Sequence, residues 1–222
     1  STDYDGTWTD VIVGNVAGKG INALTVAPNG WIWAVCTDGR IYVSKNIGLT
    51  WTRMHDGSVT AQPLIGVVFV NASLGFAVGD SNTVLRTSNK GDSWTLYTGP
   101  AAGTNLTSVS INREGYLFVT ASDATMHRSI DYANSWAQIL AMGAGTLAKA
   151  EFDPKLGYYG YAIHNNAAGV GTMLRSEDGG VSWLAWDTPT NTGLNDLDIV
   201  GPNMVYVCGN AAFVAKFDRA AS

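Results

Sequence analysis

An eight-residue pattern that ends in tryptophan occurs four times along the chain. The four segments read SKNIGLTW at 44–51, TSNKGDSW at 87–94, SIDYANSW at 129–136 and SEDGGVSW at 176–183. Each has Ser or Thr first, Asn or Asp third, Gly or Ala fifth, Ser or Thr seventh and Trp last. One match would say little, whereas four matches predict a local structure that the fold builds repeatedly.

The spacing of these tryptophans limits the fold further. Trp8, in the segment DGTWTDVIVG, has similar surroundings. The spacings between successive tryptophans are 43, 43, 42 and 47 residues for the series Trp8, Trp51, Trp94, Trp136 and Trp183. A period of about 40–45 residues with short strands is typical of propeller blades. Short apolar or alternating runs between Gly and Asn also favour strands over helices.

Each repeat contains four such runs. In the first they are INALTVAP, WIWAVC, RIYVS and TWTRM. An insertion around 165–171 accounts for the longer fourth spacing. The predicted blades cover about 21–56, 63–99, 105–142, 147–188 and 194–222.

The fifth repeat lacks one strand, because LNDLDIV, MVYVC and AFVAKF have no fourth partner after them. The segment 7–13, TWTDVIV, can supply it. A blade completed by the other end of the chain leaves no open edge and closes the ring. We therefore predict one all-β domain over 1–222: a five-bladed β-propeller with four-stranded blades, in which the N-terminal strand completes the C-terminal blade.

The pattern resembles the Asp-box, or bacterial neuraminidase repeat, over essentially the whole chain. The resemblance implies a structural role at the hairpin between the third and fourth strands, where Asn or Asp accepts amide hydrogen bonds and Gly adopts a positive φ. Ala133 departs from the usual Gly, and Asn46 and Asn89 from the usual Asp. The expected box residues are Ser44, Asn46, Gly48, Trp51, Thr87, Asn89, Gly91, Trp94, Ser129, Asp131, Trp136, Ser176, Asp178, Gly180, Trp183 and Trp8.

The composition excludes several classes of partner. The formal net charge is −5 and no Lys or Arg cluster is present, so a nucleic-acid partner is not expected. No apolar run is long enough for a membrane helix, so no membrane insertion is expected. The first residues do not resemble a secretory signal. The chain has two cysteines, Cys36 and Cys208; reduced core residues are favoured over a disulfide. We expect no metal site and no cofactor.

The sequence contains candidate catalytic residues but no complete catalytic set. Arg86, Arg128 and Arg175 occupy one repeat-equivalent position and should form a ring, not the convergent triad of a sialidase. Glu151, Asp196 and Asp198 fall on first strands near the predicted channel, and glycoside hydrolysis needs two facing carboxylates. The alternative is that these acids hydrate the channel or pair with Lys149. We predict that the chain is not an enzyme.

Binding is expected on the rim opposite the boxes. The turn residues Asp38, Ser81, Asp123 and Asn210 are repeat-equivalent and could form a polar ring, although turns favour such residues in any case. The insertion breaks the symmetry, and its His164, Asn165 and Asn166 are the best candidates for a specific contact. The alternative is a surface loop without a role.

The favoured function is a non-enzymatic binding or assembly module. Its partner is either a protein in an assembly or a surface glycan. Among proteins with this box, a phage or virion structural or receptor-recognition propeller fits best. The alternatives are a carbohydrate-binding lectin and a small glycoside hydrolase. The sequence leaves the localisation open.

Overall fold

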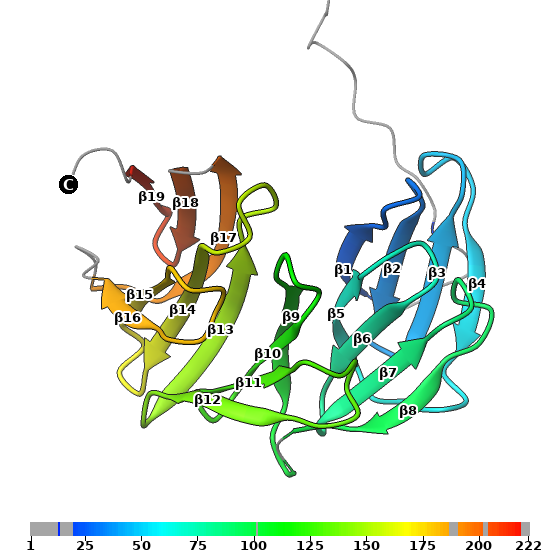
Figure 1. Cartoon of the computed structure of the whole chain (residues 1–222), viewed down its shortest axis with the longest axis horizontal. Coiled ribbons are helices and arrows are strands. Elements are labelled where there is room, and N and C mark those ends of the chain that lie inside the picture. Colours follow the sequence, from blue (N-terminus) through cyan, green and yellow to red (C-terminus); the bar gives the residue numbers. More distant parts are fainter. Residues whose placement is uncertain (1–12, 14–19, 101, 187–190, 202–203, 219–222) are drawn as a thin grey trace, which may run out of the picture.

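The chain forms strands and turns around one axis (Figure 1). The computed structural model describes residues 13, 20–100, 102–186, 191–201 and 204–218. These residues form nineteen strands in five antiparallel sheets, four with four strands and one with three. Within each sheet the strands follow chain order, so every connection is a hairpin. The fold is therefore the all-β, five-bladed β-propeller that the repeat predicts.

The strand bounds are as follows. The first sheet contains β1 (Ile21–Val26), β2 (Ile32–Cys36), β3 (Arg40–Ser44) and β4 (Thr52–Asp56). The second contains β5 (Leu64–Phe69), β6 (Gly75–Gly79), β7 (Thr83–Thr87) and β8 (Thr95–Thr98). The third contains β9 (Leu106–Ile111), β10 (Leu117–Ala121), β11 (Thr125–Ser129) and β12 (Ala137–Ala141). The fourth contains β13 (Gly145–Phe152), β14 (Gly160–Asn166), β15 (Gly171–Ser176) and β16 (Leu184–Trp186), and the fifth β17 (Leu194–Gly201), β18 (Met204–Gly209) and β19 (Phe213–Asp218).

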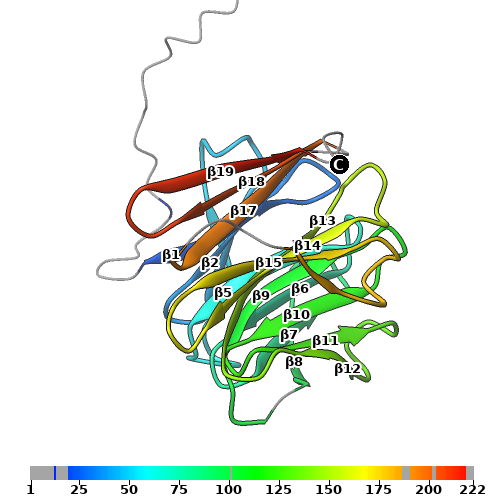
Figure 2. The same cartoon turned by 90° about the vertical axis from the view of Figure 1, so that its left-hand side faces the viewer.

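The first strand of each sheet lies innermost, and consecutive sheets pack face to face. β1 contacts β5, β5 contacts β9, β9 contacts β13 and β13 contacts β17. Figures 1 and 2 show these five sheets arranged as an arc, with the first and fifth sheets at its two ends. The core is accordingly divided into separate apolar clusters between neighbouring sheets.

The four box turns share one hydrogen-bond scheme. In the fourth box, Ser176 Oγ accepts from the amide of Gly180 at 2.9 Å, and Asp178 Oδ1 accepts from the amides of Val181 and Ser182. Asn46 Oδ1 and Asn89 Oδ1 accept the equivalent amide in the first two boxes at 2.9 and 3.0 Å. Asn and Asp share this acceptor oxygen, so the substitution preserves the turn.

The fourth and fifth box positions both have positive φ in every turn. The fifth is Gly48, Gly91, Ala133 or Gly180, and the fourth is Ile47, Lys90, Tyr132 or Gly179. Side chains other than glycine pay a steric penalty in this region. Ala133 is thus tolerated at a strained position, as the sequence departure suggested.

Tryptophans at the ends of the boxes fill the spaces between sheets. Trp94 is buried between the first two sheets, where its ring meets Trp33 of the first sheet and Phe69 of the second edge to face at centroid distances of 6.0 and 6.1 Å. Trp136 and Trp183 pack against the next two clusters in the same way. Large aromatic rings bury much apolar area, so these contacts stabilise the stacking of successive sheets.

One seam of the ring is open in the described residues. Leu64 in β5 is buried because the second sheet packs on the first. The equivalent residues of the later sheets are buried against the preceding sheet in the same way: Leu106, Leu147 and Leu194. In β1 the equivalent Ile21 is exposed, and Leu24 and Val26 on the same face are 60% and 68% exposed. Around the ring, the sheet that precedes β1 is the fifth sheet.

The fifth sheet exposes the matching surface. Tyr206, Cys208 and Val214 occupy the positions of Phe76, Val78 and Val84, which are buried in the second sheet. The expectation that Cys208 is a core residue is therefore wrong for the described chain, because no described sheet covers its face. Cys36 is buried, and neither cysteine is in a disulfide. The predicted closing strand at 7–13, with Trp8, lies outside the described residues except for Val13, which packs beside Ala34 and Tyr42 on the exposed side of the first sheet.

Candidate functional site

The central channel is the main concave feature that the first strands create. A cavity of about 450 Å³ is lined by residues of all five first strands, β1, β5, β9, β13 and β17. A second cavity of about 260 Å³ continues it toward the box rim and shares Val68, Val109 and Glu151 with the first. Together they make a channel whose wall chemistry is set by one strand from each sheet.

A β-bulge recurs near the beginning of the first strands. The pairing with the second strand shifts between Ile21 and Ala23, Leu64 and Gly66, Leu147 and Lys149, and Leu194 and Asp196. A bulge adds one residue and redirects the following side chains. In β13 and β17 the residues redirected in this way are Lys149 and Asp196, which both line the channel.

Neighbouring first strands are joined by side-chain hydrogen bonds at this level. Ser108 Oγ accepts from the amide of Ala150 at 3.1 Å and lies 2.7 Å from Thr120 Oγ1. Asn22 Nδ2 donates to the carbonyl of Leu64 at 2.8 Å. These bonds satisfy polar groups that no sheet ladder reaches, and they hold the channel wall in place.

The charged side chains of the channel gather on one side. Lys149 Nζ lies 3.1 Å from Glu151 Oε1 and also pairs with Asp196 Oδ1, so one ammonium group bridges β13 and β17. Asp198 lies two residues after Asp196 in β17 and lines the second cavity together with Glu151. Asp198 makes no hydrogen bond or ion pair with the described residues. Two of the three carboxyl groups therefore share one cation, and the Asp198 side chain has no cation beside it among the described residues.

Burial and mutual repulsion act on this group. Burial raises the pKa of Glu151, and although Lys149 opposes the shift, the charges of Asp196 and Asp198 add to it. Burial lowers the pKa of Lys149, but its bond to Asp196 and the charge of Glu151 outweigh that effect and the net pKa is raised. Lys149 thus remains charged at neutral pH, while Glu151 is protonated more easily than a free glutamate.

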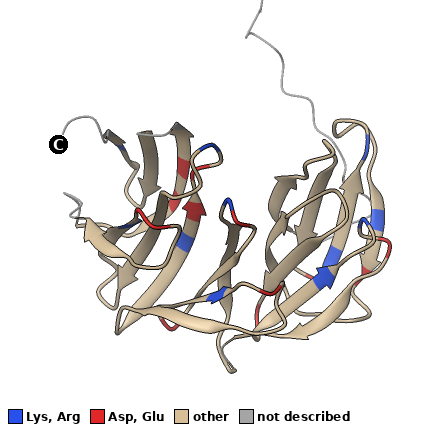
Figure 3. Cartoon of the chain, viewed as in Figure 1, with Lys and Arg blue, Asp and Glu red and all other residues tan. Residues whose placement is uncertain are grey.

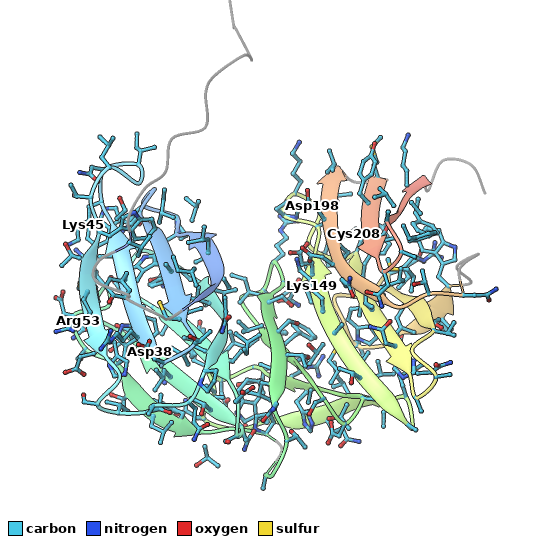
Figure 4. All side chains as sticks on the ribbon, turned by 180° about the vertical axis from the view of Figure 1, so that it is seen from behind. Asp38, Lys45, Arg53, Lys149, Asp198 and Cys208 are labelled. Atoms are coloured by element: carbon cyan, nitrogen blue, oxygen red, sulfur yellow. The ribbon has the colours of Figure 1, made fainter. Side chains whose placement is uncertain are left out.

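The opposite wall of the channel, formed by β1 and β5, is uncharged. Apolar side chains such as Leu24, Ile65 and Val68 lie there beside the polar Asn22 and Thr25. Figure 3 shows acidic and basic residues of β13 and β17 together on the inner side of one arm of the arc. Figure 4 labels Lys149 and Asp198 on that arm and Asp38 on the other. The channel is therefore asymmetric, with an acidic side and an uncharged, largely apolar side.

This arrangement favours ligand binding over hydrolysis. Two glycosidase carboxylates must face each other across a sugar bond, one as acid and one as base or nucleophile. Here Glu151 and Asp196 both hold the same ammonium group of Lys149, the pairing that the sequence analysis weighed as the alternative. Among the described residues no cluster of three His, Cys, Asp or Glu side chains could hold a metal ion.

The predicted contact residues of the insertion are used largely within the protein. The insertion lengthens the β14–β15 hairpin, and Asn165 Nδ2 and Oδ1 both bond the backbone of Leu194, at 2.7 and 2.8 Å. Asn166 Oδ1 accepts from the turn amides of Ala168 and Val170. His164 is buried, and burial lowers its pKa. The exposed part of this feature is the turn at 166–169, and Val170 is half-buried.

The four residues of the predicted polar ring lie at equivalent turns of separate sheets. Asp38 pairs with Arg40 at 3.4 Å, and Asp123 accepts from Thr125. Ser81 Oγ donates to Gln62 and Asn210 Oδ1 accepts from Asn195. Each contact is local to its turn or to an adjacent connection, and none joins two ring members.

One feature of the site was beyond the reach of sequence reasoning. The bulges that direct Lys149 and Asp196 inward carry no distinctive residue type. The arginines before the boxes lie away from the channel, as expected: Arg86 stacks over Tyr97, and Arg175 lies over Trp186 and pairs with Glu177. No helix in the described part of the chain is long and apolar enough to span a bilayer.

Comparison with known proteins agrees with the fold. Residues 1–88 match the family model described as photosynthesis system II assembly factor YCF48. YCF48 from Cyanidioschyzon merolae superposes with a TM-score of 0.73 at 16% identity, covering 100% of this chain and 76% of that one. YCF48 bound to D1 peptide gives 0.70 at 16% identity, with 96% and 68% covered. No curated protein matches the chain by sequence.

Enzymes share the same architecture. The GH74 xyloglucanase from Xanthomonas campestris superposes with a TM-score of 0.73 at 14% identity, and the match spans 88% of this chain but 36% of the enzyme. Virginiamycin B lyase from Staphylococcus aureus gives 0.75 at 12% identity, with 99% and 76% covered. At such identities the likeness concerns the fold and not the activity.

The fold and the recurring turns define a class: the chain is a five-bladed β-propeller whose hairpin turns resemble the bacterial neuraminidase repeat. Within that class, the sequence similarity is to the YCF48 assembly-factor model and is confined to the N-terminal 88 residues. The solved structures, at 16% identity or less, show the fold, and the family model covers less than half of the chain. They lend no support to a phage or virion origin, to a lectin, or to a glycan partner.

Proposed function

We propose that the chain is a non-enzymatic module that binds a segment of a partner protein at the mouth of its central channel. The segment inserts a Lys or Arg side chain beside Asp198 and Asp196 and lays apolar side chains against β1 and β5. The observation that carries this proposal is the imbalance of charge on the channel wall. Among the described channel residues, Glu151 and Asp196 pair with one cation, Lys149, and Asp198 pairs with none.

The apolar wall supplies the second part of the recognition. Ile65, Val67 and Val68 line the channel opposite the acids, so a segment with adjacent cationic and apolar residues would contact both sides. Binding sites of this kind are mostly apolar, with a few placed polar groups that fix orientation. A charged group entering the channel also gains from the reduced screening there.

The surrounding rim and the structural relatives fit this reading. The β14–β15 hairpin, with its turn at 167–170, belongs to the sheet that carries Lys149 and Glu151. We therefore include the insertion around His164, Asn165 and Asn166 in the proposed partner surface, as the part that extends from the rim. One similar propeller is described as YCF48 bound to D1 peptide, which supports a peptide segment as the partner in this proposal.

The test uses two synthetic peptides with the same apolar residues, one with lysines and one with glutamates at matched positions. We expect the purified chain to bind the lysine peptide more tightly, with an affinity that falls as salt increases. Asp198→Asn should weaken that binding by about tenfold, equivalent to about 1.4 kcal/mol. Fluorescence anisotropy of labelled peptides measures both effects.

Asp92→Asn is the matched control, because it removes the same charge from an exposed residue on the box rim. It should leave peptide affinity unchanged. Equal binding of both peptides, or equal loss from the two variants, would contradict the proposal. Turnover of a β-glucan or a sialoside by the wild-type chain would contradict the non-enzymatic part independently.

A further inference from the structure

Equivalent residues of three neighbouring first strands line the second cavity of the channel, whose volume is about 260 Å³. These residues are Ser110 of β9, Glu151 of β13 and Asp198 of β17. Each is paired with an aromatic residue of the adjoining second strand, namely Phe118, Tyr161 and Tyr206 in turn. The repeat therefore places three oxygen-bearing side chains at one level of the channel, in three consecutive sheets.

The oxygen atoms of these side chains are not fully used within the described part of the protein. Ser110 is 7% exposed, and its buried Oγ has no hydrogen-bond partner, whereas Ser108 in the same strand accepts from a backbone amide of the next sheet at 3.1 Å. Glu151 pairs with Lys149 through Oε1, and no described residue forms a hydrogen bond or ion pair with Asp198. A buried hydroxyl group without a partner lowers stability. A ligand that brings hydrogen-bond donors would therefore supply what this cavity lacks.

The charge of the cavity wall selects a cationic ligand. Burial raises the pKa of Glu151, and the charge of Asp198 adds to the rise although Lys149 opposes it, so the two carboxyl groups are close enough to repel each other. Arg113 and Lys155 lie in the turns that follow β9 and β13, and neither lines the cavity. The described lining therefore has two acids and no cation of its own.

The rest of the lining is apolar and suits an alkyl stem. It consists of Val68, Val109, Ile111, Phe152, Pro154 and Ile199. A lysine side chain buries its methylene groups along apolar surface while its ammonium group contacts polar atoms. That ammonium group has three hydrogen-bond donors and no acceptor. Its three donors match the three side chains that offer oxygen atoms to the cavity.

We propose that the second cavity receives the primary ammonium group of a lysine side chain of the partner segment, with Ser110, Glu151 and Asp198 as its acceptors. This inference rests on the peptide site proposed above and narrows its cation from Lys or Arg to Lys. A guanidinium group is flat and holds its donors in a rigid fork that suits one bidentate carboxylate. Oxygen atoms from three separate strands suit the compact, rotatable donors of an ammonium group instead. Acetylation of that lysine would remove its charge, so the cavity would also distinguish a modified partner from an unmodified one.

The experiment compares three labelled peptides that differ only in having lysine, arginine or Nε-acetyllysine at the cationic positions. Fluorescence anisotropy with the full chain measures their affinities. We expect the lysine peptide to bind about tenfold more tightly than either of the others. Ser110→Ala should weaken binding of the lysine peptide by about tenfold, the loss expected for one hydrogen bond, and leave the arginine peptide unchanged. The unfolding temperature of this variant should not fall, because the hydroxyl group that it removes has no partner in the protein.

Ser176→Ala is the matched control, because Ser176 is also buried but its Oγ accepts from the amide of Gly180 at 2.9 Å. It should lower the unfolding temperature and keep the preference for lysine. The inference fails if the arginine or acetyllysine peptide binds as tightly as the lysine peptide. It also fails if Ser110→Ala weakens both cationic peptides equally or neither, or lowers the unfolding temperature as Ser176→Ala does. A lysine peptide that binds no better than its glutamate counterpart would overturn the proposed function as well, whereas equal binding of lysine and arginine peptides overturns this inference alone.

Discussion

Asn165 of β14 holds both backbone groups of Leu194 at the start of β17. Its Nδ2 donates to the Leu194 carbonyl at 2.7 Å, and its Oδ1 accepts from the Leu194 amide at 2.8 Å. Leu194 is itself fully buried in the cluster between the fourth and fifth sheets. A single side chain thus acts as a clamp between the fifth sheet and the rest of the arc.

The first prediction follows from this clamp. Asn165→Ala should lower the free energy of unfolding by about 1–3 kcal/mol, because it leaves two backbone groups of Leu194 without their partner. Urea unfolding measures the change. Asn22→Ala is the graded control, since Asn22 makes one comparable bond, to the carbonyl of Leu64, and should cost less. Equal effects would show that the second hydrogen bond of Asn165 adds nothing.

The second prediction concerns the acid of the fourth box. Burial acts to raise the pKa of Asp178, but its hydrogen bonds from Ser182, Ser176 and Val181 outweigh burial and lower it below the usual 3.8. A lowered folded pKa means that the contribution of Asp178 to stability is complete above 3.8 and is lost as the pH falls through the folded value.

Asp178→Asn should remove that acid dependence while keeping the turn, because Asn46 and Asn89 build the same turn in the first two boxes. We expect similar unfolding temperatures for variant and wild type at neutral pH, and a smaller loss for the variant at about pH 3. Asp178→Ala should be less stable at both pH values. If Asp178→Asn lost stability in acid as steeply as the wild type, other groups would be responsible.

The third prediction tests closure of the ring. If the fifth sheet packs on the first in solution, Leu24 is buried there as the equivalent Val67 is buried against its neighbour. Leu24→Ala should then lower the free energy of unfolding by about 2 kcal/mol or more, whereas an exposed position would change it by about 0.5 kcal/mol at most. Calorimetry or urea unfolding distinguishes the two.

Deleting residues 1–13 examines the same closure from the other side. The predicted fourth strand of the last sheet would be missing, and β19 would keep an unpaired edge beside exposed Val214. We expect aggregation or loss of cooperative unfolding. A soluble truncation that unfolds in one sharp transition would contradict closure by the N-terminal strand.

The fourth prediction concerns the insertion. Because Asn165 holds Leu194, the informative change is to shorten only the turn at 167–170 and leave this clamp in place. If the insertion contacts the partner, the shortened chain should keep its unfolding temperature and lose affinity for the lysine peptide. Unchanged peptide affinity, measured by anisotropy, would remove the turn from the binding surface.

The repeat by itself determined the all-β propeller, the strand order and the chemistry of the turns. Those features depend on interactions within a few residues, such as the bonds that Asp178 accepts from Val181 and Ser182, and such local interactions can be read from residue spacing. The sequence also indicated Glu151, Asp196 and Asp198 as residues near the channel. The sequence left open whether these acids form ion pairs with Lys149.

The tertiary structure decided how the repeats differ from one another. Bulges at the beginnings of β13 and β17 turn Lys149 and Asp196 toward each other across two sheets, forty-seven positions apart in the chain. Residue types do not encode that direction, because a shift of one position reverses the face on which a strand displays its side chains. The exposed seam at Leu24 and the clamp at Asn165 likewise arise from how separate sheets meet, and no local pattern specifies such contacts.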